Sequence, residues 1–302
     1  MSSPGHQALP APSLLQRCLR RVNKEGIHWT LRILRQGPIP KHLGFIMDGN
    51  RRFARKHHVE TGIGHYRGFD KLEEVLEWCL LLGVQAVTIY AFSIENFKRS
   101  SSEVSSLMDL AKEKLQVLCQ HSELVREYRV RIRVLGDLSL LQQDVREAMQ
   151  EAMRMTLHHD GPLLNICFPY TAREDMTQAV NRVVNQVRAG HLREGSITED
   201  TIEAHLHTQP QDLPLDLLLR TSGEIRLSDF LLWQASLPGC QIHFSSVLWP
   251  ELGLWHLLPA LLSYQSQYPR LCVRQSLSST ARASPPLPSL PFIPFYRESV
   301  KH

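Results

Sequence analysis

The residues best suited to chemistry in this sequence fall into three clusters, each directly after an apolar run. The first is Asp48-Gly49-Asn50-Arg51-Arg52, which combines a carboxylate, a glycine, an amide and two arginines. A carboxylate beside arginines can hold a hard cation such as Mg2+ while guanidinium and backbone N–H groups bind phosphate oxygens. The glycine lets the backbone approach an anion closely, and a helix beginning near Asn50 would direct its N-terminal dipole at that anion. Taken singly, these residues would also suit an Asp-Gly turn followed by a solvated basic helix.

The second and third clusters repeat this arrangement. Residues 90–99 supply Ser93, Asn96, Phe97 and Arg99 after one apolar run, and residues 219–228 supply Arg220, Arg226 and Ser228 after another. Open α/β sheets bind ligands beyond the carboxyl ends of their strands, so three strand ends carrying arginine and small polar residues indicate a diphosphate site. The common phosphate-loop, nucleophile-elbow and zinc-helix motifs do not occur, and the glycines near residue 64 match a dinucleotide fingerprint poorly.

The elements that must position these clusters alternate from Lys41 onward between short apolar runs and longer periodic stretches, which is typical of βα units around a parallel sheet. The predicted strands are 43–47, 86–92, 130–135, 163–168, 215–219 and 241–244, and the predicted helices lie near 68–82, 101–125, 140–157, 172–189 and 253–265. Capping boxes mark three helix starts, at Ser100 with Glu103, Thr171 with Glu174, and Ser196 with Glu199. We therefore predict an α/β fold with a single open, mostly parallel six-stranded sheet flanked by helices.

Composition and charge narrow the class of protein. The 302 residues are 43% hydrophobic and 21% charged, as in globular proteins, and no apolar run reaches the ~18 residues that cross a bilayer. The six cysteines form no C-x-x-C pair and are expected to be reduced core thiols. No nucleic-acid-binding module is present, so we expect no nucleic-acid partner.

The N-terminal segment is basic and amphipathic. Residues 1 to 60 carry 11 Lys/Arg against 3 Asp/Glu, and residues 13–36 place apolar side chains at helical spacing, with Trp29 among arginines. Such a segment can lie on an anionic membrane surface, or it can pack against its own domain.

The three clusters occur in order with Gly64-His65, Phe230-Leu231-Leu232-Trp233-Gln234 and Trp249-Pro250-Glu251, and together they resemble the signature regions of the cis-prenyltransferase (undecaprenyl diphosphate synthase) family. Within that family the sequence is most similar to the eukaryotic dehydrodolichyl diphosphate synthase branch, from about Pro38 to Leu262. The resemblance implies a Mg2+-dependent enzyme that condenses isopentenyl diphosphate with farnesyl or a longer allylic diphosphate. The product would be a polyprenyl diphosphate for dolichol synthesis and protein glycosylation, grown in a hydrophobic tunnel. The D-D-x-x-D motif of trans-prenyltransferases is missing.

The resemblance also assigns roles and domains. It makes Asp48 the Mg2+ ligand and gives the allylic diphosphate to Gly49, Asn50, Arg51, Arg52 and Phe53, with His65 assisting. Ser93, Asn96, Phe97 and Arg99 would line the reaction centre, where Asn96 or a phosphate oxygen would relay a proton. Arg220, Arg226 and Ser228 would bind the diphosphate of isopentenyl diphosphate. Residues 38–265 would form the catalytic domain, after the amphipathic segment 1–37 and before a Ser/Pro-rich, disordered tail at 266–302.

The sequence departs from the family pattern at three places. Thr61 stands where an arginine usually binds diphosphate, Gln241 replaces a carboxylate of bacterial members, and a C-terminal Arg-x-Gly element is missing. In two-subunit eukaryotic members the partner, the Nogo-B receptor in animals, supplies that element. The resemblance therefore implies a heteromer bound peripherally to the cytosolic face of the endoplasmic reticulum membrane. The alternative is a catalytically weak or inactive regulatory subunit that binds the partner.

Overall fold

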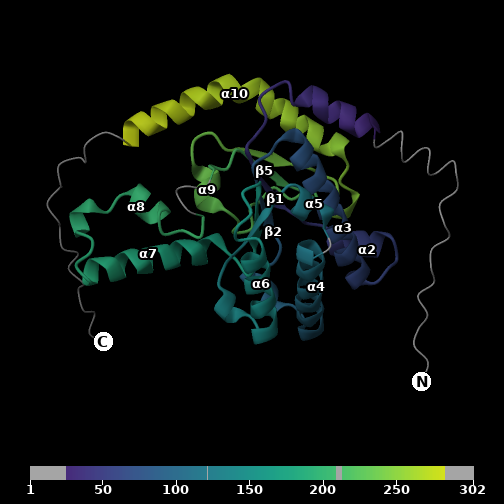
Figure 1. The fold of residues 1–302 in the computed structure, drawn as a ribbon, viewed down its shortest axis with the longest axis horizontal. Helices are drawn as coiled ribbons and strands as arrows, with labels where there is room; N and C mark the ends of the chain where they lie inside the picture. The colour runs from purple at the N-terminus through teal and green to yellow at the C-terminus, as the bar shows by residue number, and fades with distance from the viewer. Residues whose placement is uncertain (1–24, 121, 209–212, 283–302) are drawn as a thin grey trace, which may run out of the picture.

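A sheet of six strands forms the centre of the protein, seen in a computed structural model that describes residues 25–120, 122–208 and 213–282 (Figure 1). The strand order is β3-β4-β2-β1-β5-β6, and every neighbouring pair is parallel. The strands are β1 (His42–Ile46), β2 (Ala86–Tyr90), β3 (Arg131–Leu135), β4 (Leu163–Cys167), β5 (Leu217–Arg220) and β6 (Gln241–Phe244). The predicted open six-stranded sheet is confirmed, and it is wholly parallel.

Helices cover both faces of the sheet. Alternate residues of β5 show this, because Leu217 and Leu219 join the main apolar core while Leu218 joins a smaller core on the other face. Strands buried on both sides read as continuous apolar runs, which is why the sequence located them well. The helices and short 3-10 turns are α2 (Asn50–Lys56), α3 (Thr61–Leu82), η1 (Ile94–Lys98), α4 (Ser101–Gln120), α5 (Glu123–Glu127), η2 (Leu138–Leu140), α6 (Gln143–Met155), α7 (Ala172–Arg188), η3 (Glu194–Ser196), α8 (Glu199–Glu203), α9 (Leu232–Ser236), η4 (Trp249–Glu251) and α10 (Leu254–Arg282).

The strand order creates the place for a site. The chain leaves β1 for β2 on one side of it and later reaches β5 on its other side, so β1 lies between strands from two parts of the chain. Sheets of this kind open a crevice at such a switch point, beyond the carboxyl ends of the strands. The loops after β1, β2 and β5 carry the three clusters found in the sequence.

Two predictions about helix ends are wrong. α10 does not stop near residue 265 but continues to Arg282, so residues 266–282 are helical instead of belonging to a disordered tail, while 283–302 lie outside the described residues. The buried side chains of Leu257, Leu261 and Leu271 keep a helical spacing past Pro269, and this packing outweighs the proline as a stop signal. Ser196 does not cap α8, because Thr198 accepts the N–H of Thr201 instead.

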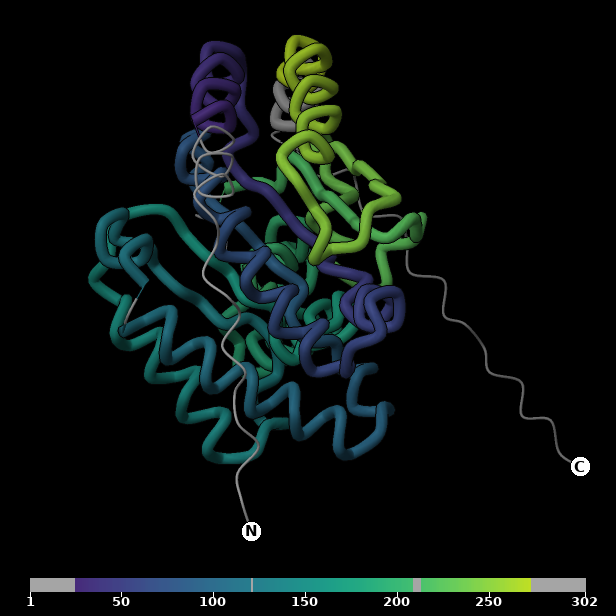
Figure 2. The backbone as a smooth tube through the Cα atoms, turned by 90° about the vertical axis from the view of Figure 1, so that its right-hand side faces the viewer, coloured from purple at the N-terminus to yellow at the C-terminus, as the bar shows by residue number. Residues whose placement is uncertain are grey.

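The helix at residues 25–34 lies beside α10 at one end of the molecule (Figures 1 and 2). Its Leu31 and Leu34 are buried in the core, and Gln265 Nε2 donates to the Leu34 carbonyl at 2.7 Å. Trp29 and Ile33 remain 62% and 69% exposed. One face of this helix therefore packs on its own domain while the other stays apolar and accessible, and residues 1–24 lie outside the described residues.

Three of the described thiols lie in the core as expected from the sequence, and two do not. Cys79, Cys119 and Cys167 are buried free thiols, whereas Cys240 is half-buried, Cys272 is exposed and Cys18 lies outside the described residues. Burial raises the pKa of the Cys79 thiol to about 12, so it behaves as a neutral core group. Among the described helices, none has the length and apolar character that a membrane crossing requires.

Candidate active site

The loop between β1 and α2 depends on a glycine. Gly49 has φ 108°, in the left-handed region, and it is the N-cap of α2. A Cβ at this position would collide with the Ser222 hydroxyl, so a larger residue would displace the loop after β5. Gly49 thereby lets two of the three clusters come into direct contact.

The backbone of Asp48 is fixed by three neighbours. Its N–H donates to Thr221 Oγ1 at 3.0 Å, and its carbonyl accepts the Ser222 hydroxyl at 2.6 Å and the Trp249 N–H at 2.9 Å. Trp249 is buried and its indole N–H donates to the Gly68 carbonyl at 2.7 Å. Residues from the loop after β5, from η4 and from α3 thus hold the position of one carboxylate.

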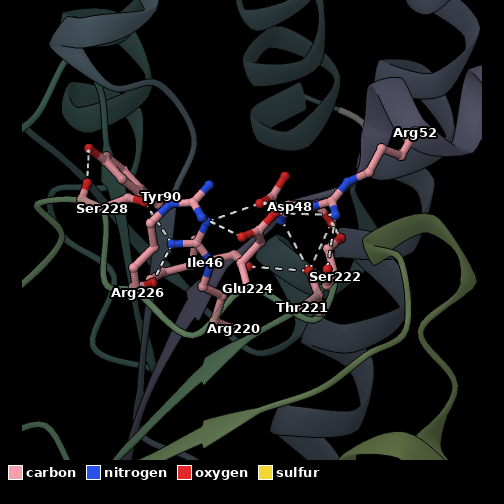
Figure 3. Close-up of polar contacts among 10 residues, drawn as sticks. All are labelled: Ile46, Asp48, Arg52, Tyr90, Arg220, Thr221, Ser222, Glu224, Arg226 and Ser228. Atoms are coloured by element: carbon pink, nitrogen blue, oxygen red, sulfur yellow. Dashed lines mark hydrogen bonds and ion pairs between the residues drawn. The ribbon is translucent and has the colours of Figure 1, made fainter.

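The Asp48 carboxylate bridges two arginines (Figure 3). Its Oδ2 lies 3.0 Å from Arg220 Nη2 and 3.2 Å from Arg52 Nη2. Arg220 is only 3% exposed, and its other Nη donates to Ser228 Oγ at 2.7 Å and to the Arg226 carbonyl. A buried guanidinium needs hydrogen-bond acceptors, and Arg220 finds them in Asp48, Ser228 and the Arg226 carbonyl. Arg220 therefore connects Asp48 to the loop after β5.

Glu224, a carboxylate that the sequence analysis did not assign to the site, forms ion pairs with two of its arginines. Its Oε1 lies 3.4 Å from Arg52 Nη1, and its Oε2 pairs with Arg226. Arg52 also donates to the Ser222 carbonyl at 3.0 Å, whereas the Arg226 side chain is 64% exposed. Arg226 is therefore accessible to a ligand, while Arg52 already binds Asp48, Glu224 and the Ser222 carbonyl.

These groups border a polar pocket of about 270 Å³. It is lined by Met47, Asp48, Gly49, Asn50, Arg51, Arg52, Arg55, His65, Arg99, Glu224 and Arg226. The five arginines outnumber the two carboxylates, so the pocket is electropositive and suits a multiply charged anion.

His65 and Asn50 present unsatisfied atoms at the inner side of this pocket. Asn50 Nδ2 is 3.5 Å from His65 Nδ1, and neither Asn50 Oδ1 nor His65 Nε2 has a hydrogen-bond partner among the described residues although both atoms are buried. Burial, and next the nearby Arg99, lower the pKa of His65 below its ordinary value, while Glu103 opposes them. His65 is thus neutral at pH 7, and its free Nε2 is available to a ligand.

Glu103 was predicted only as part of the helix cap with Ser100, but its carboxylate also reaches the site. Its N–H donates to Ser100 Oγ at 3.3 Å, as the predicted cap requires, but its carboxylate accepts Arg99 Nη1 at 2.8 Å. It also lies 3.8 Å from His65 Nε2. The i,i+4 spacing of Arg99 and Glu103 was the signal that could have revealed this pair.

An apolar cavity of about 140 Å³ adjoins the polar pocket. Met47, Asn50 and His65 line both, so the two spaces meet at these side chains. Its other walls come mainly from α3, α4 and strands β2 and β4, including Leu72, Leu107, Leu115, Ile89 and Ile166. The site as a whole therefore has an electropositive part suited to an anion and an apolar part suited to a hydrocarbon.

Several residues predicted for the site lie outside both spaces. Ser93 and Asn96 cap η1, because the Ser93 N–H donates to Asn96 Oδ1 at 3.0 Å while Ser93 Oγ accepts the Glu95 N–H. Phe97 packs edge-on against Phe92 in the core at 5.0 Å between ring centroids. Phe53 packs against His57 at 4.3 Å on α2.

The two positions that depart from the family pattern also separate in space. Thr61 is the first residue of α3 and lines a groove with His65, Ser100 and Glu103, so it borders the site. Gln241 pairs with Leu217 at the start of β6, whereas Phe244, opposite Arg220, stands at its carboxyl end. Within this chain Gln241 therefore lies at the end of β6 away from Asp48.

The oxygen donors around Asp48 suit Mg2+. Arg52 and Arg220 both contact Oδ2 of Asp48, no hydrogen bond to Oδ1 is seen among the described residues, and the Asp48 side chain lines the arginine-rich pocket. No group of three His, Cys, Asp or Glu side chains in the described part of the chain could hold a metal by itself. Mg2+ is commonly held by one or two carboxylates together with substrate phosphates, so one free carboxylate oxygen beside a diphosphate pocket fits this ion.

The chain is similar to several known proteins. Residues 46–272 match the model of the undecaprenyl diphosphate synthase family of prenyltransferases. A dehydrodolichyl diphosphate synthase complex subunit of Homo sapiens is 49% identical over 236 residues, which cover 78% of this chain and 70% of that protein. A dehydrodolichyl diphosphate synthase complex subunit of Schizosaccharomyces pombe is 43% identical over 249 residues, covering 80% and 94%. The crystal structure of lavandulyl diphosphate synthase from Lavandula x intermedia with dimethylallyl diphosphate superposes with a TM-score of 0.71 at 34% identity, covering 75% and 95%.

Proposed function

This chain belongs to the undecaprenyl diphosphate synthase family of prenyltransferases, and we propose that it makes a polyprenyl (dehydrodolichyl) diphosphate for dolichol synthesis and protein glycosylation. Its substrates would be isopentenyl diphosphate and farnesyl or a longer allylic diphosphate. The observation that carries the proposal is the junction of an arginine-lined pocket with an apolar cavity at Met47, Asn50 and His65. A prenyl diphosphate has the same two parts, an anionic head and a hydrocarbon chain.

By this proposal the two diphosphates bind side by side. The allylic diphosphate would lie against the start of α2 near Arg51 and Arg52, with its chain in the apolar cavity. The diphosphate of isopentenyl diphosphate would bind Arg226, the accessible arginine of the loop after β5. Arg220 and Ser228 are hydrogen-bonded to each other, so we assign them the task of holding that loop in place.

The chemistry follows from the charge that develops. The allylic C–O bond breaks while the double bond of isopentenyl diphosphate attacks the allylic carbon, and the departing diphosphate gains negative charge that the arginines stabilise. Mg2+, held by Asp48 and the diphosphate oxygens, would supply further charge stabilisation as a Lewis acid. His65 is neutral at pH 7, so it would orient the diphosphate by hydrogen bonding rather than by charge.

The final step releases a proton. Asn96 Oδ1 already accepts the Ser93 N–H, so this amide holds the turn after β2 rather than serving as a free base. We therefore assign the proton to a diphosphate oxygen and leave Ser93 and Asn96 as positioning residues. A weak base suffices, because the proton leaves a carbocation-like intermediate.

The assembly and location form the finer part of the proposal. Relatives are subunits of a dehydrodolichyl diphosphate synthase complex, so we propose a heteromer with a Nogo-B receptor-like partner that supplies the missing Arg-x-Gly element. We also propose peripheral attachment to the cytosolic face of the endoplasmic reticulum. Exposed Trp29 and Ile33, with Arg32 at 5.8 Å from the Trp29 ring, give the helix at 25–34 the apolar and basic groups that such contact uses.

The comparisons do not favour the alternative of a catalytically inactive regulatory subunit, because the relatives are synthases and synthase subunits. That alternative now depends mainly on Thr61, which borders the site.

An activity assay tests the proposal directly. The purified chain, alone and with the partner subunit, would be incubated with farnesyl diphosphate, labelled isopentenyl diphosphate and Mg2+. We expect labelled polyprenyl lipid when the partner is present, and less without it. If no labelled lipid forms in either mixture while a relative's complex is active under the same conditions, the proposed function is wrong.

A further inference from the structure

The loop after β5, residues 221–231, ends in backbone of a kind that side chains disfavour. Ser228, Asp229 and Leu231 have φ angles of 49°, 63° and 45°, all in the left-handed region. Such conformations persist only where the surroundings fix them. Arg226, the accessible arginine to which we assign the diphosphate of isopentenyl diphosphate, lies two positions before this stretch. Its placement therefore depends on the contacts that hold the stretch.

One set of contacts ties the stretch to the sheet. Arg220 of β5 donates to Ser228 Oγ at 2.7 Å, and the Tyr90 hydroxyl at the end of β2 donates to the Ser228 carbonyl at 3.3 Å (Figure 3). Phe230 is fully buried, and its ring stacks on Tyr90 at 4.5 Å between ring centroids. These contacts fix the residues on either side of Asp229.

A second set of contacts ties Asp229 itself to the start of α7. Asp229 Oδ1 accepts the Arg173 backbone N–H at 3.0 Å, Oδ2 accepts Arg173 Nε at 2.7 Å, and the Asp229 carbonyl accepts the Ala172 N–H at 2.7 Å. The first N–H groups of a helix have no partners within it, and the helix dipole favours a carboxylate there. The Asp229 side chain is only 13% exposed, so its charge depends on these donors.

The same arginine reaches toward the loop after β2. Arg173 Nη2 lies 3.9 Å from Glu95 Oε1 in η1. Ion pairs at this distance between exposed groups contribute little, so the contact with Asp229 is the stronger of the two. Arg173 is 71% exposed and lines neither the polar pocket nor the apolar cavity. It can therefore affect a substrate only through the loops that it contacts.

We propose that Arg173 and Asp229 are positioning residues that place Arg226 for the diphosphate of isopentenyl diphosphate. The inference rests on the proposed function, because it concerns one of the two substrates that this function requires. Without the Arg173 guanidinium, the Asp229 carboxylate loses a charged donor and the left-handed stretch can relax. Arg226 must then be ordered when the diphosphate arrives, which reduces the free energy of binding. The allylic diphosphate is assigned to the start of α2, a separate element, so its binding should change little.

Steady-state kinetics with the partner subunit provide the first measurement. We expect Arg173→Met to raise the KM for isopentenyl diphosphate about tenfold and to change the KM for farnesyl diphosphate by less than about twofold. Arg173→Lys retains a charged donor for Asp229, so it should recover most of the loss. The matched control is Arg182→Met, which removes an exposed arginine of the same helix that donates to the His205 carbonyl at 2.6 Å. This control should behave as the wild type does.

A double variant tests whether the two residues act through each other. Asp229→Ala should raise the KM for isopentenyl diphosphate at least as much as Arg173→Met does. The double variant should be no worse than Asp229→Ala alone, because its second change removes a contact that is already lost. Additive losses would show that the residues act separately and would overturn the inference.

A third measurement does not require turnover. Isopentenyl thiodiphosphate and farnesyl thiodiphosphate would each be titrated into the folded complex by calorimetry. We expect Arg173→Met to bind the isopentenyl ligand about tenfold more weakly than the wild type and the farnesyl ligand equally well. Equal losses for the two ligands, or no loss for either, overturn the inference and leave the proposed function standing. A wild-type complex that makes no lipid and binds neither ligand overturns the proposed function, and this inference with it.

Discussion

The guanidinium of Arg220 lies 3.0 Å from the carboxylate of Asp48, although the two residues are 172 positions apart in the chain. This contact joins the loops after β1 and β5, and it buries the arginine almost completely while a third of the Asp48 side chain stays exposed. Arg220 is therefore the buried, structural member of the pair, and Asp48 is the member that a ligand can reach. Substitutions of the two residues should have different consequences.

Arg220→Met should destabilise the fold. It leaves Asp48 Oδ2, Ser228 Oγ and the Arg226 carbonyl without their shared donor, and losing a buried partner of this kind costs about 2–3 kcal/mol when the carboxylate is partly solvated. Urea unfolding would measure the loss. Arg226→Met is the matched control, because that side chain is 64% exposed, and we expect a change within about 0.5 kcal/mol. Equal losses in both variants would refute the structural role of Arg220.

Asp48→Asn should remove activity while preserving the fold. Asparagine keeps an oxygen acceptor for Arg220, but it loses the charge that a divalent cation needs, so we expect a rate at least about 10²-fold lower at any Mg2+ concentration. Circular dichroism and the urea midpoint would confirm folding, and a Mg2+ titration of the rate would measure the effect. A variant that retains a rate within threefold of the wild type would show that the metal site lies elsewhere.

Much of the sheet could be predicted because its strands are buried on both faces. β1, β2 and β5 are largely apolar runs of four or five residues followed by polar clusters, and such runs have few other interpretations. The end of α10 was missed because residues 266–302 were assigned to a Ser/Pro-rich tail, whereas tertiary packing of residues such as Leu271 keeps the chain helical past Pro269.

The candidate site could be predicted in residue type but not in arrangement. Asp48, Arg52 and Arg226 were expected together, yet nothing local reveals that Glu224 links Arg52 to Arg226. Similarly, Asn96 offers the same amide to a ligand or to its own backbone, and its capping bond to Ser93 depends on the turn that forms after β2. Whether such a side chain reaches a ligand or bonds its own backbone depends on its direction, which the conformation of the folded loops sets.

His65 should titrate below its ordinary pKa of 6.5. Burial and Arg99 lower its pKa and Glu103 raises it, so Arg99→Met should move the titration upward and Glu103→Gln should move it further down. NMR of the imidazole signals would follow both shifts. Because the folded-state pKa is depressed, the unfolded chain binds this proton first as the pH falls. The contribution of His65 to stability is therefore present above pH 6.5 and is lost as the pH drops through the folded pKa. Shifts of the same sign in both variants would contradict this electrostatic account.

Thr61→Arg should strengthen binding of the allylic diphosphate. Thr61 begins α3 and lines the groove that includes His65 and Glu103, so an arginine there could reach toward the polar pocket. One added charge-assisted hydrogen bond should lower the KM for farnesyl diphosphate by about tenfold. Ile63→Arg provides the matched control, because it adds the same charge two residues further along α3 at an exposed position that lines neither the groove nor the pocket.

The kinetics of these two variants would also decide what Thr61 means for the natural chain. A lower KM in Thr61→Arg alone would identify the wild type as a working enzyme with a weakened diphosphate contact. Equal effects in both variants would reflect general attraction of anions to a more basic surface, which salt should screen. If the rate is negligible with the partner present and neither variant changes it, the chain would be a binding subunit without activity of its own.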